Sequence, residues 1–208
     1  METNERTKFE EAEYKKGYKL IAGIDEAGRG PLAGPVVAAA CIMPRGLILN
    51  DVKDSKKLSA SKREELYHYF VGHPDIKFGV GIVANDRIDE INILKASLEA
   101  MTLAVINLPI EPDYLLIDGN QLPPTGILSK AIIKGDSLSQ SIGAASIIAK
   151  YIRDELMLEY HKKWPEYGFD THKGYGTKAH LEALQTYGPC SIHRNSFEPI
   201  RLLKNLHI

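Results

Sequence analysis

The sequence predicts an α/β protein with a mixed β-sheet flanked by helices and a small helical C-terminal extension. Three observations predict it: two buried-strand patterns stand close together near the start of the chain, strand and helix patterns then alternate, and only helical patterns follow Pro165. The length of 208 residues is close to the usual size of one domain. We expect a main domain at 1–165, with a possible N-terminal arm at 1–16, and an extension at 166–208 packed on it.

The strands are predicted from short apolar runs that end at glycine, proline or acidic residues; we place them at 18–25, 35–43, 77–84, 113–117 and 131–133. The helices are predicted from apolar residues at helical spacing, from a capping box that begins at Ser61 and from Thr177 as an N-cap. Pro165 ends the longest of them, because proline cannot continue a helix. The helices are expected at 61–71, 86–107, 137–163 and 178–185.

Composition and charge exclude several classes of protein. No apolar run approaches the length that crosses a bilayer, and the first residues are too charged for a secretory signal. Cys41 and Cys190 lack the spacing of a disulfide framework or a zinc site. Net charge is −1, but residues 119–208 hold 11 basic and 8 acidic residues, so a local patch there would catch an anionic ligand. We expect a monomeric, cytoplasmic protein with no membrane contact.

Carboxylates follow three of the predicted strands: Asp25-Glu26, Asp118 and Asp136. Strand ends in α/β sheets form ligand-binding crevices, and acids gathered there repel one another unless a cation neutralises them. Ligands that are all oxygens favour a hard ion such as Mg²⁺ or Mn²⁺. Two such ions about 3.5–4 Å apart suit phosphodiester hydrolysis.

Each acid also has a structural alternative. Neighbouring strand residues point to opposite faces, so Asp25 and Glu26 would share an ion only if the strand breaks there. Asp118 before a glycine is typical of a turn, and Asp136 before a helix is typical of an N-cap. The coincidence of acids at three strand ends favours the metal site.

A glycine-rich stretch at 27–34 follows the first pair of acids. Its spacing is GxGxxxG, which does not fit a dinucleotide-binding fingerprint, and the chain has no GxxxxGK[ST] phosphate loop. Glycine lets a polymer backbone approach closely, and Arg29 could pair with a phosphate. A hairpin turn with a solvated Arg29 is the alternative.

Together these motifs resemble type 2 ribonuclease H, also called ribonuclease HII. The resemblance spans about 18–200, and the motifs occur in the same order as in the family. Arg29 in the glycine turn and the short segment before the first motif favour type 2 over type 3. It rests on GIDEAGRGPLAGPVV at 23–37, DSKKLS at 54–59, IDG at 117–119, KGD at 134–136, AASIIAK at 144–150, HKGYGT at 172–177 and IHR at 192–194.

The resemblance implies a ribonuclease H-like fold, with 1–165 as the catalytic domain, and a divalent-metal endoribonuclease using Mg²⁺ or Mn²⁺. Such enzymes cut the RNA strand of RNA/DNA hybrids and incise duplex DNA at single ribonucleotides, leaving 3′-hydroxyl and 5′-phosphate ends. No sliding-clamp motif is visible. By motif, the catalytic and metal-binding acids are Asp25, Glu26, Asp118 and Asp136, and the residues that read the 2′-hydroxyl are Gly28, Arg29, Gly30 and Tyr175.

Other residues are candidates for contacts with the nucleic-acid backbone. Gly143, Ser146 and Lys150 recur on one face of the long predicted helix, although Gly143 could instead serve close packing. Tyr175 could alternatively cap the extension against the core, and His193-Arg194 has no assigned role. The remaining candidates, each of which could equally be solvated surface, are Ser55, Lys56, Lys57, Lys134, His172 and Lys173.

Two other functions compete with this one. A DNA-junction nuclease of the same fold would cut an all-DNA substrate. A non-catalytic hybrid-binding protein would gain nothing from four acids facing phosphates, so the acids favour an enzyme.

Overall fold

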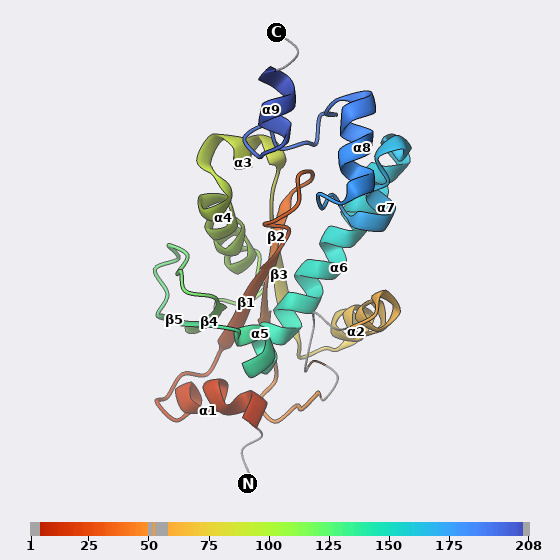
Figure 1. Ribbon diagram of the computed structural model, residues 1–208. Coiled ribbons are helices and arrows are strands. Elements are labelled where there is room, and N and C mark those ends of the chain that lie inside the picture. Colours follow the sequence, from red (N-terminus) through yellow and green to blue (C-terminus); the bar gives the residue numbers. More distant parts are fainter. Residues whose placement is uncertain (1–4, 50–51, 53–57, 206–208) are drawn as a thin grey trace.

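The computed structural model describes residues 5–49, 52 and 58–205. A five-stranded sheet lies at its centre, in the order β3-β2-β1-β4-β5 (Figure 1). Strand β1 pairs antiparallel with β2 and parallel with β4; β2 and β3 are antiparallel, and β4 and β5 parallel. The predicted mixed sheet is confirmed. Its strands are β1 (Ile21–Ala27), β2 (Val36–Ile42), β3 (Lys77–Val83), β4 (Tyr114–Asp118) and β5 (Ser129–Ile132).

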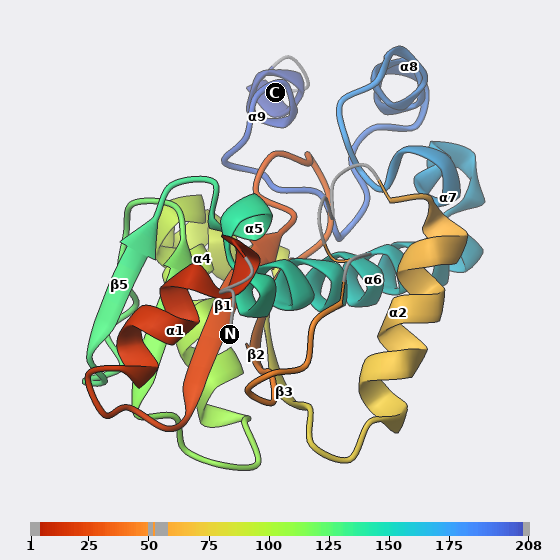
Figure 2. The ribbon, with the colours of Figure 1, turned by 90° about the horizontal axis from the view of Figure 1, so that it is seen from below.

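Helices cover both faces of the sheet: α4 lies on one face, and α6 lies on the other with α2 beside it (Figures 1 and 2). None of the helices in the described part of the chain is both long and apolar enough to span a membrane. The helices are α1 (Lys8–Tyr14), α2 (Ala60–Gly72), α3 (Asn85–Ile91), α4 (Ile93–Ile106), α5 (Gly135–Leu138), α6 (Gln140–Lys163), α7 (Phe169–His172), α8 (Lys178–Tyr187) and α9 (Ile200–Asn205), with 3₁₀ turns η1 (Glu5–Thr7) and η3 (Pro165–Tyr167).

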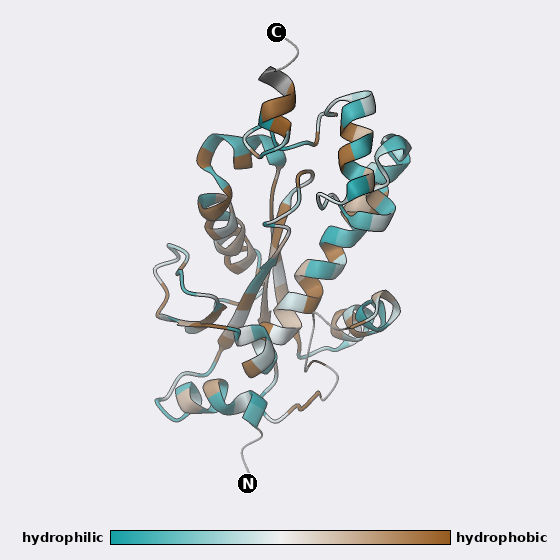
Figure 3. Ribbon diagram, viewed as in Figure 1, coloured by the Kyte–Doolittle hydropathy of each residue, from teal (hydrophilic) through white to brown (hydrophobic). Residues whose placement is uncertain are grey.

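The alternation of side chains along β2 explains why the sheet is buried on both faces. Ala38 and Ala40 belong to the core packed against α4, whereas Ala39 and Cys41 belong to the core shared with α6 and α2. The sequence of β2 is therefore apolar throughout. Hydrophobic colour runs along the strands and α4 (Figure 3).

Three predicted helix boundaries are wrong because polar side chains cap the backbone elsewhere. The helix predicted at 86–107 is divided at Asn92, which has φ 70° and accepts hydrogen bonds from the backbone N–H groups of Leu94 and Lys95. The helix predicted at 137–163 is divided at Ser139, which is extended and caps α6. Ser59, rather than Ser61, caps α2.

Both ends of the described chain pack on the central sheet and its helices. The predicted N-terminal arm contains α1, where Glu10 Oε1 accepts hydrogen bonds from Ser139 Oγ at 2.6 Å and from Ser141 N at 3.0 Å. At the other end, a hydrophobic cluster joins Leu32 and Met157 to residues from α7, α8 and α9. The division into domains at residue 165 stays a prediction.

Candidate active site

The parallel pairing of β1 with β4 brings two of the predicted acidic positions to one edge of the sheet. Ile24 of β1 pairs with Ile117 of β4, and the next residues along the two strands are Asp25-Glu26 and Asp118. Gly23 lets α6 approach β1 at this edge, because an added Cβ would lie 2.1 Å from the backbone carbon of Ser141. Strand ends and the start of α6 therefore enclose the acids.

Asp25 is the most enclosed of these acids, with 4% of its surface exposed. Its Oδ1 accepts a hydrogen bond from the backbone N–H of Glu26 at 2.7 Å. Burial, followed by the negative charges of Glu26 and Asp118, raises the pKa of Asp25 well above its usual value, and a hydrogen bond with Ser146 opposes the shift. Three carboxylates therefore lie close enough to interact.

Glu26 lies at the rim of the site, where it meets Arg29. Burial raises the pKa of Glu26, and the nearby Arg29 guanidinium opposes that rise. Arg29 Nη1 lies 3.1 Å from Glu26 Oε1. We expected the strand to break at these acids, because only then would both side chains face one ion. The strand does not break, since β1 continues to Ala27. Asp25 and Glu26 nevertheless line one cavity.

Asp118 and Asp136 are connected through the start of α5. Asp118 Oδ1 accepts hydrogen bonds from the backbone N–H of Gly135 at 2.6 Å and of Asp136 at 3.4 Å. Asp136 is 5% exposed and lies inside α5, whose N-cap is Lys134, so Asp136 is not an N-cap. The turn at Asp118 is real, since Gly119 has φ +97°, but it also presents the Asp118 carboxylate to α5.

The four acids fit a hard divalent cation by their chemistry. Within the described ranges, no three His, Cys, Asp or Glu side chains are grouped so that they could hold a metal ion as they stand. The donors are nevertheless all carboxylates, and the charges of Glu26 and Asp118 add to burial in raising the pKa of Asp25. To share an ion, Glu26 would replace its contact with Arg29 by a contact with the ion, and Asp118 would do the same with its contact to Gly135.

A cavity of about 380 Å³ opens beside Asp25 and Glu26. Arg63 and Ala27 line it without having been predicted, whereas Asp118 and Asp136 lie outside its lining. Ser55, Lys56 and Lys57 lie outside the described residues. The predicted residues that line the cavity are Asp25, Glu26, Gly28, Arg29, Gly30, Ser146, Lys150 and Tyr175.

Three other predicted contacts lie away from this cavity. Lys134 is exposed, and its backbone has a left-handed conformation with φ 58°. Both ring nitrogens of His172 bind backbone: Nδ1 accepts from Gly174 N at 3.2 Å, so Nε2 carries the proton toward the Tyr167 carbonyl at 2.6 Å. Lys173 Nζ donates to the Asp170 carbonyl. These contacts stabilise the turn before Tyr175, and no contact with nucleic acid follows from them.

The face of α6 that carries Gly143, Ser146 and Lys150 divides into two parts. An added Cβ at Gly143 would lie 2.8 Å from Val52 Cγ1, so Gly143 serves close packing. Ser146 and Lys150 line the cavity.

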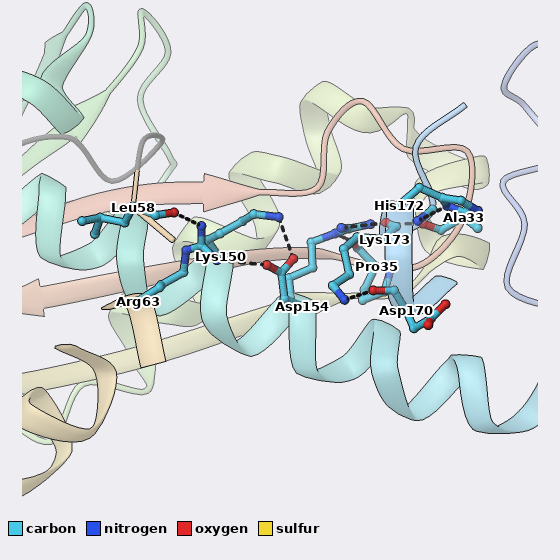
Figure 4. A network of polar contacts seen from close by, with 11 residues as sticks. Ala33, Pro35, Leu58, Arg63, Lys150, Asp154, Asp170, His172 and Lys173 are labelled. Carbon is cyan, nitrogen blue, oxygen red and sulfur yellow. Dashed lines mark hydrogen bonds and ion pairs between the residues drawn. The ribbon is translucent and has the colours of Figure 1, made fainter. Parts of the chain in front are cut away.

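An ion-pair network holds two cations at that cavity. Lys150 Nζ lies 2.6 Å from Asp154 Oδ1, and Arg63 Nη1 lies 3.3 Å from Asp154 Oδ2 (Figure 4). Arg63 Nη2 also donates to the Leu58 carbonyl at 3.1 Å. Burial lowers the pKa of Lys150, and its hydrogen bond with Asp154 opposes that change. Asp154 therefore holds both cations at the cavity.

A family model described as Ribonuclease HII matches residues 22–200. The chain belongs to the ribonuclease HII family. It is accordingly a nuclease, a hydrolase of the ribonuclease H type, and divalent-metal dependence is general in this family. The resemblance to type 2 ribonuclease H is confirmed.

Named relatives agree with this membership. Ribonuclease HII of Chlamydia caviae is 59% identical over 196 residues, which cover 94% of this chain and 92% of that protein. The crystal structure of the ribonuclease H2 from Pyrococcus horikoshii OT3 has a TM-score of 0.75 and 28% identity, covering 90% of this chain and 98% of that one. Bst-RNase HIII in complex with Mn²⁺ has a TM-score of 0.71 at 20% identity, covers 94% and 72% of the two chains, and is similar in fold.

Sequence reasoning missed Arg63, Asp154 and Arg153, and it assigned no role to Arg194. Arg153 occupies a buried position of α6, four residues after Ala149 and four before Met157. A charged residue at an apolar helical position is a detectable signal, because burying a charge requires compensating partners. Arg63 carries the same signal, because it shares the buried positions of α2 with Leu66 and Phe70. Asp154 lies four residues after Lys150, which is the spacing of an ion pair within one helix, but its other partner, Arg63, comes from a distant segment.

Proposed function

We propose that this ribonuclease HII family member cuts the RNA strand of RNA/DNA hybrids and incises duplex DNA at single embedded ribonucleotides, leaving 3′-hydroxyl and 5′-phosphate ends. One observation carries the proposal: Asp25 and Glu26 line the same cavity as Gly28, Gly30 and Tyr175. Groups suited to phosphodiester hydrolysis therefore adjoin groups suited to recognising a ribose.

The chain's own residues support recognition of the ribonucleotide. An added Cβ at Gly30 would lie 3.5 Å from Tyr175 Cε1, so the tyrosine ring stands over the glycine turn. A sugar bound in the cavity that both residues line would meet backbone groups of the turn and the face or edge of the ring. Because the 2′-hydroxyl is what distinguishes RNA from DNA, contacts of this kind would select a ribonucleotide.

The charged residues would orient the scissile phosphate. Arg29 and Lys150 line the cavity and carry the positive charge that backbone phosphates require. Asp25, Glu26, Asp118 and Asp136 would hold Mg²⁺ or Mn²⁺, which when bound activates a water and stabilises the leaving oxygen. Arg29, whose side chain lies 3.1 Å from that of Glu26, also opposes the rise that burial causes in the pKa of Glu26.

The deciding experiment uses a labelled DNA duplex that contains one ribonucleotide, with Mg²⁺, Mn²⁺ or chelator. We expect metal-dependent incision on the 5′ side of the ribonucleotide and no cutting of the matched all-DNA duplex. Equal cutting of both duplexes would contradict ribonucleotide recognition and favour a DNA-junction nuclease. Monomeric state and cytoplasmic location stay predictions.

A further inference from the structure

Two arginines are buried beneath the glycine-rich loop at 28–35. Arg153 is 1% exposed and Arg194 is fully buried. Within the described part of the chain, the hydrogen bonds that these two guanidinium groups donate all go to backbone carbonyls. Burial lowers the pKa of Arg153 and brings that of Arg194 to about 9. An arginine side chain stays cationic in proteins at neutral pH. Burying two charges is costly, and seven carbonyl contacts offset the loss of water.

Arg194 joins the two ends of this loop. Its Nη2 donates to the Gly28 carbonyl at 2.6 Å, and its Nη1 donates to the Arg29 carbonyl at 3.0 Å. Its Nε donates to the Gly34 carbonyl at 3.0 Å, and Nη2 also reaches the Pro35 carbonyl at 3.2 Å. One planar guanidinium therefore determines the shape of the turn that contains Arg29.

Arg153 joins the same loop to the turn that carries Tyr175. Its Nε and Nη2 donate to the carbonyls of Pro35 at 3.0 Å and Ala33 at 3.2 Å. Its Nη1 donates to the carbonyl of Lys173 at 3.1 Å, two residues before Tyr175. In Figure 4, Ala33 and Pro35 of the loop lie near Lys173, which comes from a segment far along the chain. This side chain therefore supports the position of Tyr175 relative to the loop, together with the backbone hydrogen bond from Leu32 N to the Gly174 carbonyl at 2.8 Å.

Gly28 is part of the same arrangement. Its φ is +96°, and an added Cβ would lie 2.1 Å from Arg153 Nε and 2.7 Å from the Pro35 carbonyl oxygen. Glycine at this position thus admits the buried guanidinium from within the protein. The requirement for glycine does not come from the substrate alone.

We propose that Arg153 and Arg194 are specificity-determining positioning residues, which set the spacing between the glycine turn and Tyr175 and thereby the recognition of the ribonucleotide. Neither side chain lines the cavity, so both act through the backbone. The inference rests on the proposed function. It adds that discrimination by the 2′-hydroxyl depends on two buried cations.

The test measures binding by the whole chain in chelator, so that no strand is cut. The variants are R153K and R194K, which keep the charge but lose the planar fork, and F197L, which removes the ring that lies 5.0 Å from the Arg194 guanidinium carbon. F197L keeps both guanidiniums and serves if a lysine variant fails to fold. The matched control is R87K, because Arg87 forms several ionic contacts on α3 and α4 away from the cavity.

The readout is the ratio of Kd values for an all-DNA duplex and the same duplex with one ribonucleotide. We expect R153K and R194K to lower this ratio about five- to tenfold, the scale of one weakened hydrogen bond to the 2′-hydroxyl, with the all-DNA Kd unchanged within about twofold. F197L should lower the ratio by a smaller factor, and R87K should leave it unchanged.

The possible failures are distinguishable. If the wild-type chain discriminates and F197L and the folded lysine variants keep the same ratio, the positioning role is wrong while the proposed function stands. A parallel loss of affinity for both duplexes would indicate a general structural role and would also overturn the inference. If the wild-type chain shows no preference for the ribonucleotide, both proposals fail together.

Discussion

The Asp118 carboxylate accepts a hydrogen bond from the backbone N–H of Gly135 at 2.6 Å. Asp118 ends β4, whereas Gly135 begins the short helix that carries Asp136. The contact therefore joins two acids that are 18 residues apart in the chain. Because the charge of Asp118, after burial and Glu26, contributes to the raised pKa of Asp25, its carboxylate connects the acids of β1 to that of α5.

Changing Asp136 to Asn should separate the catalytic role of this residue from a structural one. We expect turnover to fall about 100-fold or more, the scale of removing a group that acts directly in the reaction. The melting temperature should stay equal or rise, since a buried acid near Asp118 becomes neutral. Single-turnover rates and thermal unfolding check this, with the exposed Asp75→Asn as control. A marked fall in melting temperature would instead indicate that Asp136 serves the fold.

Tyr175 tests whether an aromatic ring takes part in recognition. The side chain is 45% exposed and stands over Gly30. Tyr175→Phe keeps the ring and should cost little, whereas Tyr175→Ala should lower kcat/KM about tenfold or more, as expected for stacking worth ~1–3 kcal/mol. The substrate is the duplex with one ribonucleotide, and Tyr69→Ala on α2 is the control. If the two variants lose activity equally, the hydroxyl rather than the ring matters.

Asp154 tests the ion-pair network at the cavity. Asp154→Asn should loosen Lys150 and Arg63 and weaken the hydrogen bond that opposes the lowered pKa of Lys150. We expect KM to rise with kcat little changed, and the slope of log K against log salt to become less negative by about one unit. Glu155→Gln, the exposed neighbour on α6, is the control. A fall in kcat at constant KM would contradict a role in substrate binding.

A chain of neutral histidines makes the C-terminal part sensitive to acid. The backbone N–H of Cys190 donates to His193 Nδ1 at 2.9 Å, so His193 Nε2 carries the proton toward His180 Nε2 at 3.0 Å. His180 Nδ1 then donates to the carbonyl of Tyr175 at 2.9 Å. Burial lowers the pKa of each histidine from 6.5 to about 4.

The sign of the pH dependence follows from these values. Between pH 6.5 and 4 the unfolded chain binds more protons than the folded chain, so the free energy of unfolding should decrease as pH falls through this window. Urea unfolding at several pH values checks this. His180→Gln should flatten the dependence relative to the wild type, whereas the exposed His68→Gln should not. Identical pH profiles of the wild type and His180→Gln would contradict this assignment.

Much of the fold could be predicted from local pattern. The apolar run of β2 indicates a strand buried on both faces, and the structure confirms it. Helix boundaries were less predictable, because the helix breaks at Asn92 and Ser139 depend on single side chains that compete for backbone N–H groups. The motifs also predicted Glu26 and Tyr175 as site residues; the two line one cavity in the structure, and their roles stay predictions.

By itself, the amino-acid sequence determined the family and the approximate positions of the strands, since both follow from short contiguous patterns, and it predicted which acids form the site. Tertiary structure alone decided that Asp154, which follows Lys150 by four residues on α6, also binds Arg63 of α2. It likewise decided how Arg153 joins the glycine loop to the turn before Tyr175. The physical reason is that a buried guanidinium needs several acceptors at once. Those acceptors are backbone carbonyls, which every residue carries and which only folding brings together.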